Sequence, residues 1–283
     1  MRVCLFILTV YCSSVGLVAA SGHFPFSLPN FRNPFLSSTT RSSTTSSSTT
    51  SSSTTSRVSR TIPNLDPRDR LTLWRIKAAS IKIFHLADDS QISTPELSVT
   101  DTPDEQQIDE DIPRSLTSPR LRNDLRDVLM AYAANPASEG YVQGQNFIAG
   151  PLLRLGLTTE EVFYLLLYFA KDVAVDYFSS DMQGVARDAL EISGRFDKCK
   201  EEAEILSLNL LPSMTSGTID KEKVLRLWDA ILFLGRDGWL AVVTALIALA
   251  CEKTTEITAM QAALPTLDIE AVLRKAVTLL HTN

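Results

Sequence analysis

The sequence predicts an all-α, multi-helix domain that follows a disordered N-terminal leader. Two observations support this fold class. From Leu65 onward, apolar residues recur at spacings of three and four, the period of an amphipathic helix. The same region has no alternating β-branched runs joined by hairpin turns, which would indicate strands. We therefore expect the chain to divide into residues 1–20, residues 21–64 and a folded domain over residues 65–283.

The first 20 residues resemble a secretory leader. Arg2 precedes an apolar run from Val3 to Ala20, and Val18-Ala19-Ala20-Ser21 fits a small-residue cleavage site. This pattern predicts a signal peptide, with a mature chain that begins near Ser21 or later. An uncleaved signal anchor is the alternative, because the run approaches the length of a membrane span. A mis-joined first exon is a third interpretation.

Residues 21–64 have an unusual composition. Residues 37–56 contain nineteen Ser or Thr and one Arg, and residues 1–56 contain no Asp, Glu or Lys. Ser-rich, Arg-bearing and acid-free sequence is typical of an organelle transit peptide. After a signal peptide, it resembles the bipartite leaders of organisms with secondary plastids. The alternative is a disordered, O-glycosylated stalk, and neither version is expected to build a core.

Charge and cysteine usage exclude several classes of function. All 33 Asp and Glu, but only 24 of the 27 Lys and Arg, lie in residues 57–283, which gives that region a net charge of −9. A nucleic-acid-binding domain would show a basic face, so we expect no nucleic-acid partner. Cys4, Cys12, Cys199 and Cys251 form neither a disulfide framework nor a CxxC metal motif. The three histidines are scattered, which argues against zinc hydrolysis and His-based triads.

Start and stop signals delimit the expected helices. Ser118 is a candidate N-cap before Pro119, and Asn135-Pro136 ends that helix. Thr158 to Glu161 opens another helix with acids in its first turn. That helix runs to Ala170. Because Phe163–Ala170 is apolar on all sides, we expect it to be central.

Further helices are predicted from the same periodicity. They are expected at 66–87, 143–155, 184–206, 220–234, 237–251 and 268–281, with Asp220 and Asp268 as caps. Polar loops are expected at 88–104 and 135–140. Leu240–Ala250 is too short for a membrane span, so it favours a buried core helix.

One segment offers an arginine suited to chemistry. Arg114 follows Pro113, which fixes its own backbone and restricts the preceding residue, so Arg114 should leave a stiff backbone. Asp111, three residues earlier, can pair with the guanidinium and aim it. The alternative is a surface ion pair worth under about 1 kcal/mol.

A second segment reads Tyr141-Val142-Gln143-Gly144 at the start of a helix. Gly144 lets another backbone approach closely. Gln143 offers one acceptor and two donors, which suits the orientation of a water molecule. The alternative is a loop glutamine without a task, since short motifs match by chance.

Together, the two segments resemble the TBC domain, the GTPase-activating domain for Rab-type small GTPases. That family carries an IxxDxxR motif and, after an intervening helix, a YxQG motif. The matching residues are Ile108, Asp111 and Arg114 for the first motif, and Tyr141, Gln143 and Gly144 for the second.

The resemblance extends over about residues 65–283. Segments 71–74, 177–184, 225–229 and 268–279 are similar to the family's opening helix, mid-domain segment, Arg-x-Trp-Asp element and closing helix. Two departures are visible. Ser115 replaces the usual threonine, and Asp188–Leu227 is shorter than in the family, so we expect part of one or two helices to be missing or rebuilt. Trp228 and Trp239 are expected in the core, and Arg226 and Asp229 as a structural pair.

The resemblance implies an activator of a partner GTPase rather than an enzyme with its own substrate. Arg114 would enter the active site of a GTP-bound Rab-type GTPase, and Gln143 would orient the attacking water. Asp111 would orient Arg114, while Tyr141 and Gly144 would shape the Gln143 loop. No cofactor is expected, because GTP and Mg²⁺ belong to the partner.

Two other functions remain open at this point. One is a catalytically inactive TBC-like module that binds a GTPase or another partner, which the shortened 188–227 region would favour. The other is an unrelated helical scaffold. Membrane contact is expected only through the partner or an uncleaved N-terminal anchor. The resemblance implies an endomembrane-associated cytoplasmic location, whereas the leader suggests the secretory pathway or a plastid-type compartment.

Overall fold

The computed structural model describes residues 61–87, 102–116, 118–136, 138–179 and 181–282. Throughout these ranges, every regular element is a helix, which confirms the predicted all-α class. The leader predictions for residues 1–60 and most of the 88–104 loop lie outside the described residues. They therefore stay predictions.

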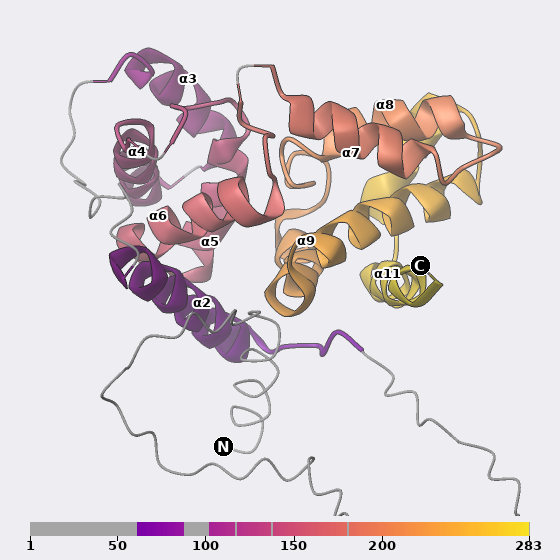
Figure 1. Ribbon diagram of the computed structural model, residues 1–283, viewed down its shortest axis with the longest axis horizontal. Coiled ribbons are helices and arrows are strands. Elements are labelled where there is room, and N and C mark those ends of the chain that lie inside the picture. Colours follow the sequence, from indigo (N-terminus) through magenta and orange to yellow (C-terminus); the bar gives the residue numbers. More distant parts are fainter. Residues whose placement is uncertain (1–60, 88–101, 117, 137, 180, 283) are drawn as a thin grey trace, which may run out of the picture. The chain divides into compact units, whose positions relative to one another are not determined.

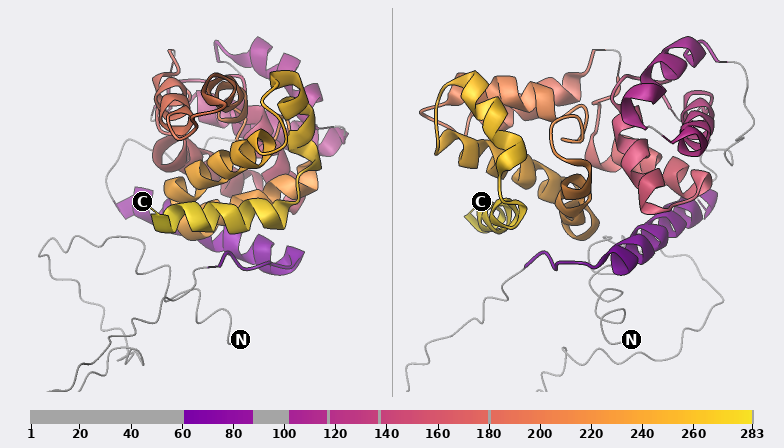
Figure 2. Two further views of the ribbon diagram at one scale, coloured as in Figure 1. Left: turned by 90° about the vertical axis from the view of Figure 1, so that its right-hand side faces the viewer. Right: turned by 180° about the vertical axis from the view of Figure 1, so that it is seen from behind.

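The order of the helices along the chain can be followed in Figure 1. The first group comprises α2 (Pro67–Ala87), α3 (Glu105–Ser115), α4 (Pro119–Ala133), α5 (Gln145–Leu155), α6 (Thr159–Tyr168) and a π-helix (Phe169–Val173). The second comprises α7 (Gln183–Ser193), α8 (Lys200–Leu210), α9 (Lys221–Cys251), α10 (Ile257–Ala263), a 3₁₀ turn (Leu264–Thr266) and α11 (Ile269–Thr282). In the second group, α7 lies along α8, and α11 lies along α9 (Figure 2).

Helix α6 lies at the centre of the first group. Residues Val162–Tyr168 are all buried, and α2, α4 and α5 pack around them, which confirms the predicted central position. The core continues through aromatic rings. The Phe169 ring stacks on Trp74 at a centroid distance of 5.9 Å and contacts Trp228 at 5.2 Å. This aromatic column joins α2, the π-helix and α9. Trp239 is also fully buried, as expected.

Several helix starts follow their predicted caps. Thr158 forms a capping box in which its hydroxyl accepts from the Glu161 amide, and the Glu161 carboxylate accepts from the Thr158 amide. Ser118 is the N-cap of α4, with Pro119 at its first position. Asp220 accepts a hydrogen bond from the Glu222 amide at 3.0 Å. These ends were predictable because a cap depends on neighbouring residues only.

One predicted helix was wrong, and one predicted helix break is confirmed. The helix expected over 184–206 is divided, because Gly194 ends α7 and non-helical backbone continues to Cys199 before α8. By contrast, the break expected between the helices at 220–234 and 237–251 is confirmed, because α9 consists of two helices separated by non-helical backbone at Gly235, where φ is 60° and ψ is −141°. Glycine adopts this backbone at little cost. Helices α3 and α10 were not predicted.

Helix α9 contains the longest apolar stretch in the described part of the chain. By length and composition it could cross a membrane, but 67% of its most apolar window is buried inside the domain. Val242, Val243, Leu246 and Ile247 are fully buried. The predicted core position of this stretch is confirmed.

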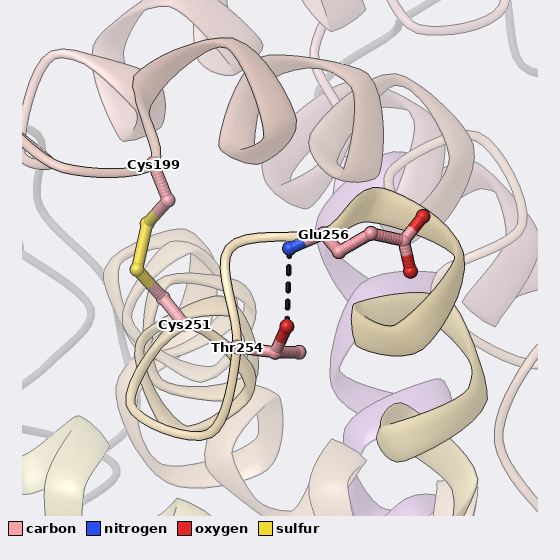
Figure 3. Close-up of a disulfide and its surroundings, with 4 residues drawn as sticks. All are labelled: Cys199, Cys251, Thr254 and Glu256. Carbon is pink, nitrogen blue, oxygen red and sulfur yellow. Dashed lines mark hydrogen bonds between the residues drawn. A yellow bond between two sulfur atoms is a disulfide. The ribbon is translucent and has the colours of Figure 1, made fainter.

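A disulfide joins Cys199, the N-cap residue of α8, to Cys251, the last residue of α9 (Figure 3). The two cysteines are 52 residues apart. No disulfide framework was expected from the sequence, and this bond corrects that expectation for Cys199 and Cys251, whose spacing matches no motif. The bond ties the shortened region to the end of the long core helix.

Reduction of this disulfide is expected to lower the free energy of unfolding by about 2–5 kcal/mol, because the unfolded chain regains the freedom of a loop of this length. Chemical denaturation with and without a thiol reductant measures the change. Cys251→Ser is the control, since its stability should be low and insensitive to reductant. Free thiols at Cys199 and Cys251 before reductant is added would contradict the pairing. Unchanged stability after complete reduction would contradict its stabilising role.

Candidate functional site

Arg114 lies in the last turn of α3, where its side chain reaches solvent. The Arg114 Nη1 atom donates to Asp111 Oδ1 at 2.6 Å, and 54% of the arginine side chain is exposed while the aspartate is 0% exposed. The expected stiff backbone has a different origin from the one predicted. Pro113 lies inside the helix, so Arg114 is held by α3 itself.

Asp111 accepts hydrogen bonds from three side chains. Besides Arg114, the Gln107 amide donates to Oδ2 at 3.1 Å, and the Tyr141 hydroxyl donates to Oδ2 at 3.0 Å. Burial, followed by the nearby Asp111 carboxylate, raises the pKa of Tyr141, so the hydroxyl remains a donor. A buried carboxylate with three donors holds one orientation and therefore orients the Arg114 guanidinium group through its Nη1 atom.

Gln143 is exposed on the loop that leads into α5. The Tyr141 amide, at the start of this loop, donates to Asp104 Oδ2 at 2.8 Å. At its end, Gly144 has φ of 121° and is the N-cap of α5. A Cβ atom at Gly144 would lie 2.9 Å from the Pro212 carbonyl oxygen. Glycine is needed here for both its backbone angle and the close approach of a second backbone.

The structure brings all six predicted site residues together. Ile108 is fully buried and anchors α3 in the core. The hydrogen bond between Tyr141 and Asp111 joins the two motifs, which are about 30 residues apart in sequence. As a result, Arg114 and Gln143 are the two exposed members of a frame whose other members are buried.

Sequence reasoning missed a seventh member, Asn146. This side chain is 0% exposed, and its amide nitrogen donates to the Asp111 carbonyl oxygen at 3.1 Å and to Ser115 Oγ at 2.7 Å. Its Oδ1 accepts from the Gly144 amide at 3.1 Å. The available signal was a polar residue two positions after the YxQG motif, at the start of an otherwise apolar helix.

The connection between α8 and α9 contacts the end of the Gln143 loop and the first turn of α5. In addition to the Pro212 contact, Ser216 Oγ donates to the Phe147 carbonyl oxygen at 2.5 Å. The connection is itself fixed to the core, because the Trp228 indole donates to the Met214 carbonyl oxygen at 3.0 Å. This connection belongs to the region that the sequence showed to be short.

A second charged cluster is structural, as expected. Arg226 Nη1 donates to buried Asp229 Oδ2 at 3.1 Å, and Arg70 makes two bonds of 2.8 Å to the same carboxylate. Arg226 also pairs with Glu270 through bonds of 2.7 and 2.9 Å. The cluster therefore connects α2, α9 and α11. Over the described residues, no group of His, Cys, Asp and Glu is placed to hold a metal ion.

The burial of these residues predicts contrasting effects on stability. Leu165→Ala in α6 should lower the free energy of unfolding by about 2–5 kcal/mol, because it removes a fully buried side chain. Arg114→Ala should cost under about 1 kcal/mol, since the arginine side chain is half-exposed and Asp111 keeps its donors Gln107 and Tyr141. Chemical denaturation compares the two. Equal losses would mean that Arg114 is a structural ion-pair residue.

A comparison with protein families identifies the domain. The Rab-GTPase-TBC domain model matches residues 70–256, which is more than half of the chain. The chain belongs to the Rab-GTPase-TBC domain family. Growth hormone-regulated TBC protein 1 of Xenopus tropicalis is 32% identical over 46% of this chain and 41% of its own length. The human protein of that name is 31% identical over 47% and 43%. The chain thus spans less than half the length of these curated relatives.

Solved structures of TBC domains share the fold. The Chlamydomonas flagellar RabGAP TBC domain superimposes with a TM-score of 0.62 at 19% identity, over 75% of this chain and 81% of that one. The Ypt/Rab-GAP domain of Gyp1p gives a TM-score of 0.53 at 18% identity over the same shares. The family model therefore gives the family, and the two solved structures give the same fold.

Proposed function

We propose that this TBC domain stimulates GTP hydrolysis by a GTP-bound Rab-type GTPase through two side chains, Arg114 and Gln143. The observation that carries the proposal is their shared frame. Both side chains are exposed, while Asp111 and Tyr141, which join their segments, are buried and hydrogen-bonded to each other. Such a frame can present two groups to one partner site without reorganising them.

Arg114 supplies positive charge. Phosphoryl transfer spreads negative charge over the oxygens of the transferring group, so catalysis depends on positioning and charge neutralisation. An arginine supplied by an activator is worth about 10³–10⁵ in rate, or about 4–7 kcal/mol of barrier. The Asp111 carboxylate binds one edge of the guanidinium, which leaves the other nitrogens available for the phosphate oxygens.

Gln143 orients water. Its amide can accept a hydrogen bond from the attacking water and donate to a phosphate oxygen at the same time. In the proposed mechanism it replaces the glutamine that the GTPase itself would use for this task. GTP and Mg²⁺ come with the partner, and the chain described here contributes side chains only.

The shortened 188–227 region still supports the chain on the C-terminal side of Gln143. The connection between α8 and α9 brings the Pro212 carbonyl oxygen close to Gly144 and bonds Ser216 to the Phe147 carbonyl oxygen in α5. The inactive binding module becomes an outcome of the test.

Single-turnover GTP hydrolysis by a panel of Rab-type GTPases tests the proposal. At least one GTPase should hydrolyse GTP faster with the full chain than without it, and Arg114→Ala should remove that stimulation. Binding of a GTP-bound GTPase without any stimulation would support the binding module instead. Neither binding nor stimulation across the panel would contradict both functions.

A further inference from the structure

We propose that Asn146 is a positioning residue that fixes the distance between the two catalytic side chains. The inference rests on the proposed function, since it explains how Arg114 and Gln143 could act in one transition state. Asn146 touches neither side chain. It acts through the Gly144 amide, next to Gln143, and the Asp111 carbonyl group, three residues before Arg114.

Three ties connect the Gln143 loop to α3. Asp104 accepts from the Tyr141 amide, Asp111 accepts from the Tyr141 hydroxyl, and Asn146 donates to the Asp111 carbonyl oxygen. The first two reach the loop only at Tyr141, before Gln143. Asn146 alone among these bonds holds the loop after Gln143, by accepting from the Gly144 amide at 3.1 Å.

The hydrogen bonds of Asn146 set the distance between the backbone next to Gln143 and the backbone next to Arg114. The Gly144 amide directly follows Gln143, and the Asp111 carbonyl group lies on the same helical turn as Arg114. Ser115, which accepts from Asn146 at 2.7 Å, directly follows Arg114. One rigid amide group therefore contacts both the segment that carries Gln143 and the segment that carries Arg114.

Asparagine is the side chain that meets all three requirements. It supplies two donors for the Asp111 carbonyl group and Ser115, and one acceptor for the Gly144 amide. Aspartate would offer the acceptor but place a carboxylate oxygen against the Asp111 carbonyl oxygen. Alanine would remove one hydrogen-bond partner from each of three buried polar groups. Because Asn146 is 0% exposed, water does not compete for these bonds and a partner protein cannot reach it.

The proposal predicts a defect in turnover rather than in binding. Asn146→Ala should lower the single-turnover rate constant at saturating GTPase by about 10- to 100-fold, the effect of a small misplacement of catalytic groups. The GTPase concentration at half-saturation should change by less than about twofold, since no contact with the partner is removed. Ser115→Ala removes one of the three bonds and should have a smaller effect.

A core variant far from the site provides the matched control. Val272→Ala in α11 removes a fully buried side chain that lies outside the site frame. It should lower stability while the turnover rate stays within about twofold of the parent. If both variants lose turnover in proportion to their loss of stability, Asn146 has only a structural role and the proposal is wrong.

A measurement without any GTPase tests whether Asn146 binds the Gly144 amide. Amide hydrogen exchange followed by NMR should show faster exchange at Gly144 in Asn146→Ala by about tenfold, the equivalent of one lost buried hydrogen bond, and no change there in Val272→Ala. Unchanged exchange at Gly144 would overturn the inference whatever the function. The inference would also be overturned if the parent stimulates a GTPase and Asn146→Ala shows faster exchange at Gly144 but the same single-turnover rate as the parent. A parent that stimulates no GTPase would instead count against the proposed function.

Discussion

Arg114→Ala is expected to lower stimulated GTP hydrolysis by about 10³-fold or more, the largest effect of any single substitution in this domain. The guanidinium neutralises charge that develops only as the phosphate transfers, so affinity for the GTP-bound partner should change much less. Single-turnover hydrolysis and direct binding to the GTP-bound GTPase measure the two quantities separately.

Two further variants control for charge and for fold. Arg114→Lys should not restore activity, because lysine lacks the planar fork that spans two oxygens. Arg195→Ala removes an exposed arginine that pairs with Glu191 on α7, away from the two motifs, and should leave stimulation unchanged. A large loss for Arg195→Ala would indicate that net charge, rather than the Arg114 position, determines the rate.

Gln143→Ala is expected to lower stimulated hydrolysis by about 10²-fold or more, because the attacking water loses its preorganised partner. Binding should again change little, since one exposed side chain is removed from the contact surface. Gln183→Ala provides the control, because Gln183 is an exposed glutamine bonded to Asp181 at the start of α7. Loss of activity in both variants would remove the special role of Gln143.

The two substitutions should not be independent. If Arg114 and Gln143 act on one transition state, the double variant should lose less activity than the product of the single effects. Their common support through Asp111 and Tyr141 is the physical reason. Full additivity would mean that the two side chains act in separate steps.

Much of the fold was predictable because its signals are local. The capping box at Thr158, the proline at the start of α4 and the all-apolar face of α6 each depend on residues a few positions apart. The break between α7 and α8 depends instead on tertiary structure. Gly194 alone did not rule out a continuous helix, and Cys199 owes its position to a bond with Cys251, 52 residues away.

The site was predictable in part for the same reason. Motif spacing marked Arg114 and Gln143, and the pairing of Asp111 with Arg114 follows from helical spacing. The supports of the loop could not be predicted, because Pro212 approaches Gly144 from a connection about 70 residues later. Asn146 was missed because a polar residue in the first turn of a helix is ordinary until its three buried partners are seen.

The central claim is that this domain supplies both the arginine and the glutamine. Single-turnover hydrolysis by a responsive Rab-type GTPase whose own water-orienting glutamine is replaced by leucine tests it most directly. The parent protein should still stimulate this GTPase, and Gln143→Ala should not. Loss of stimulation by the parent on the leucine-bearing GTPase, with Gln143→Ala fully active on the normal one, would contradict the claim and leave Arg114 as the only catalytic contribution of the chain.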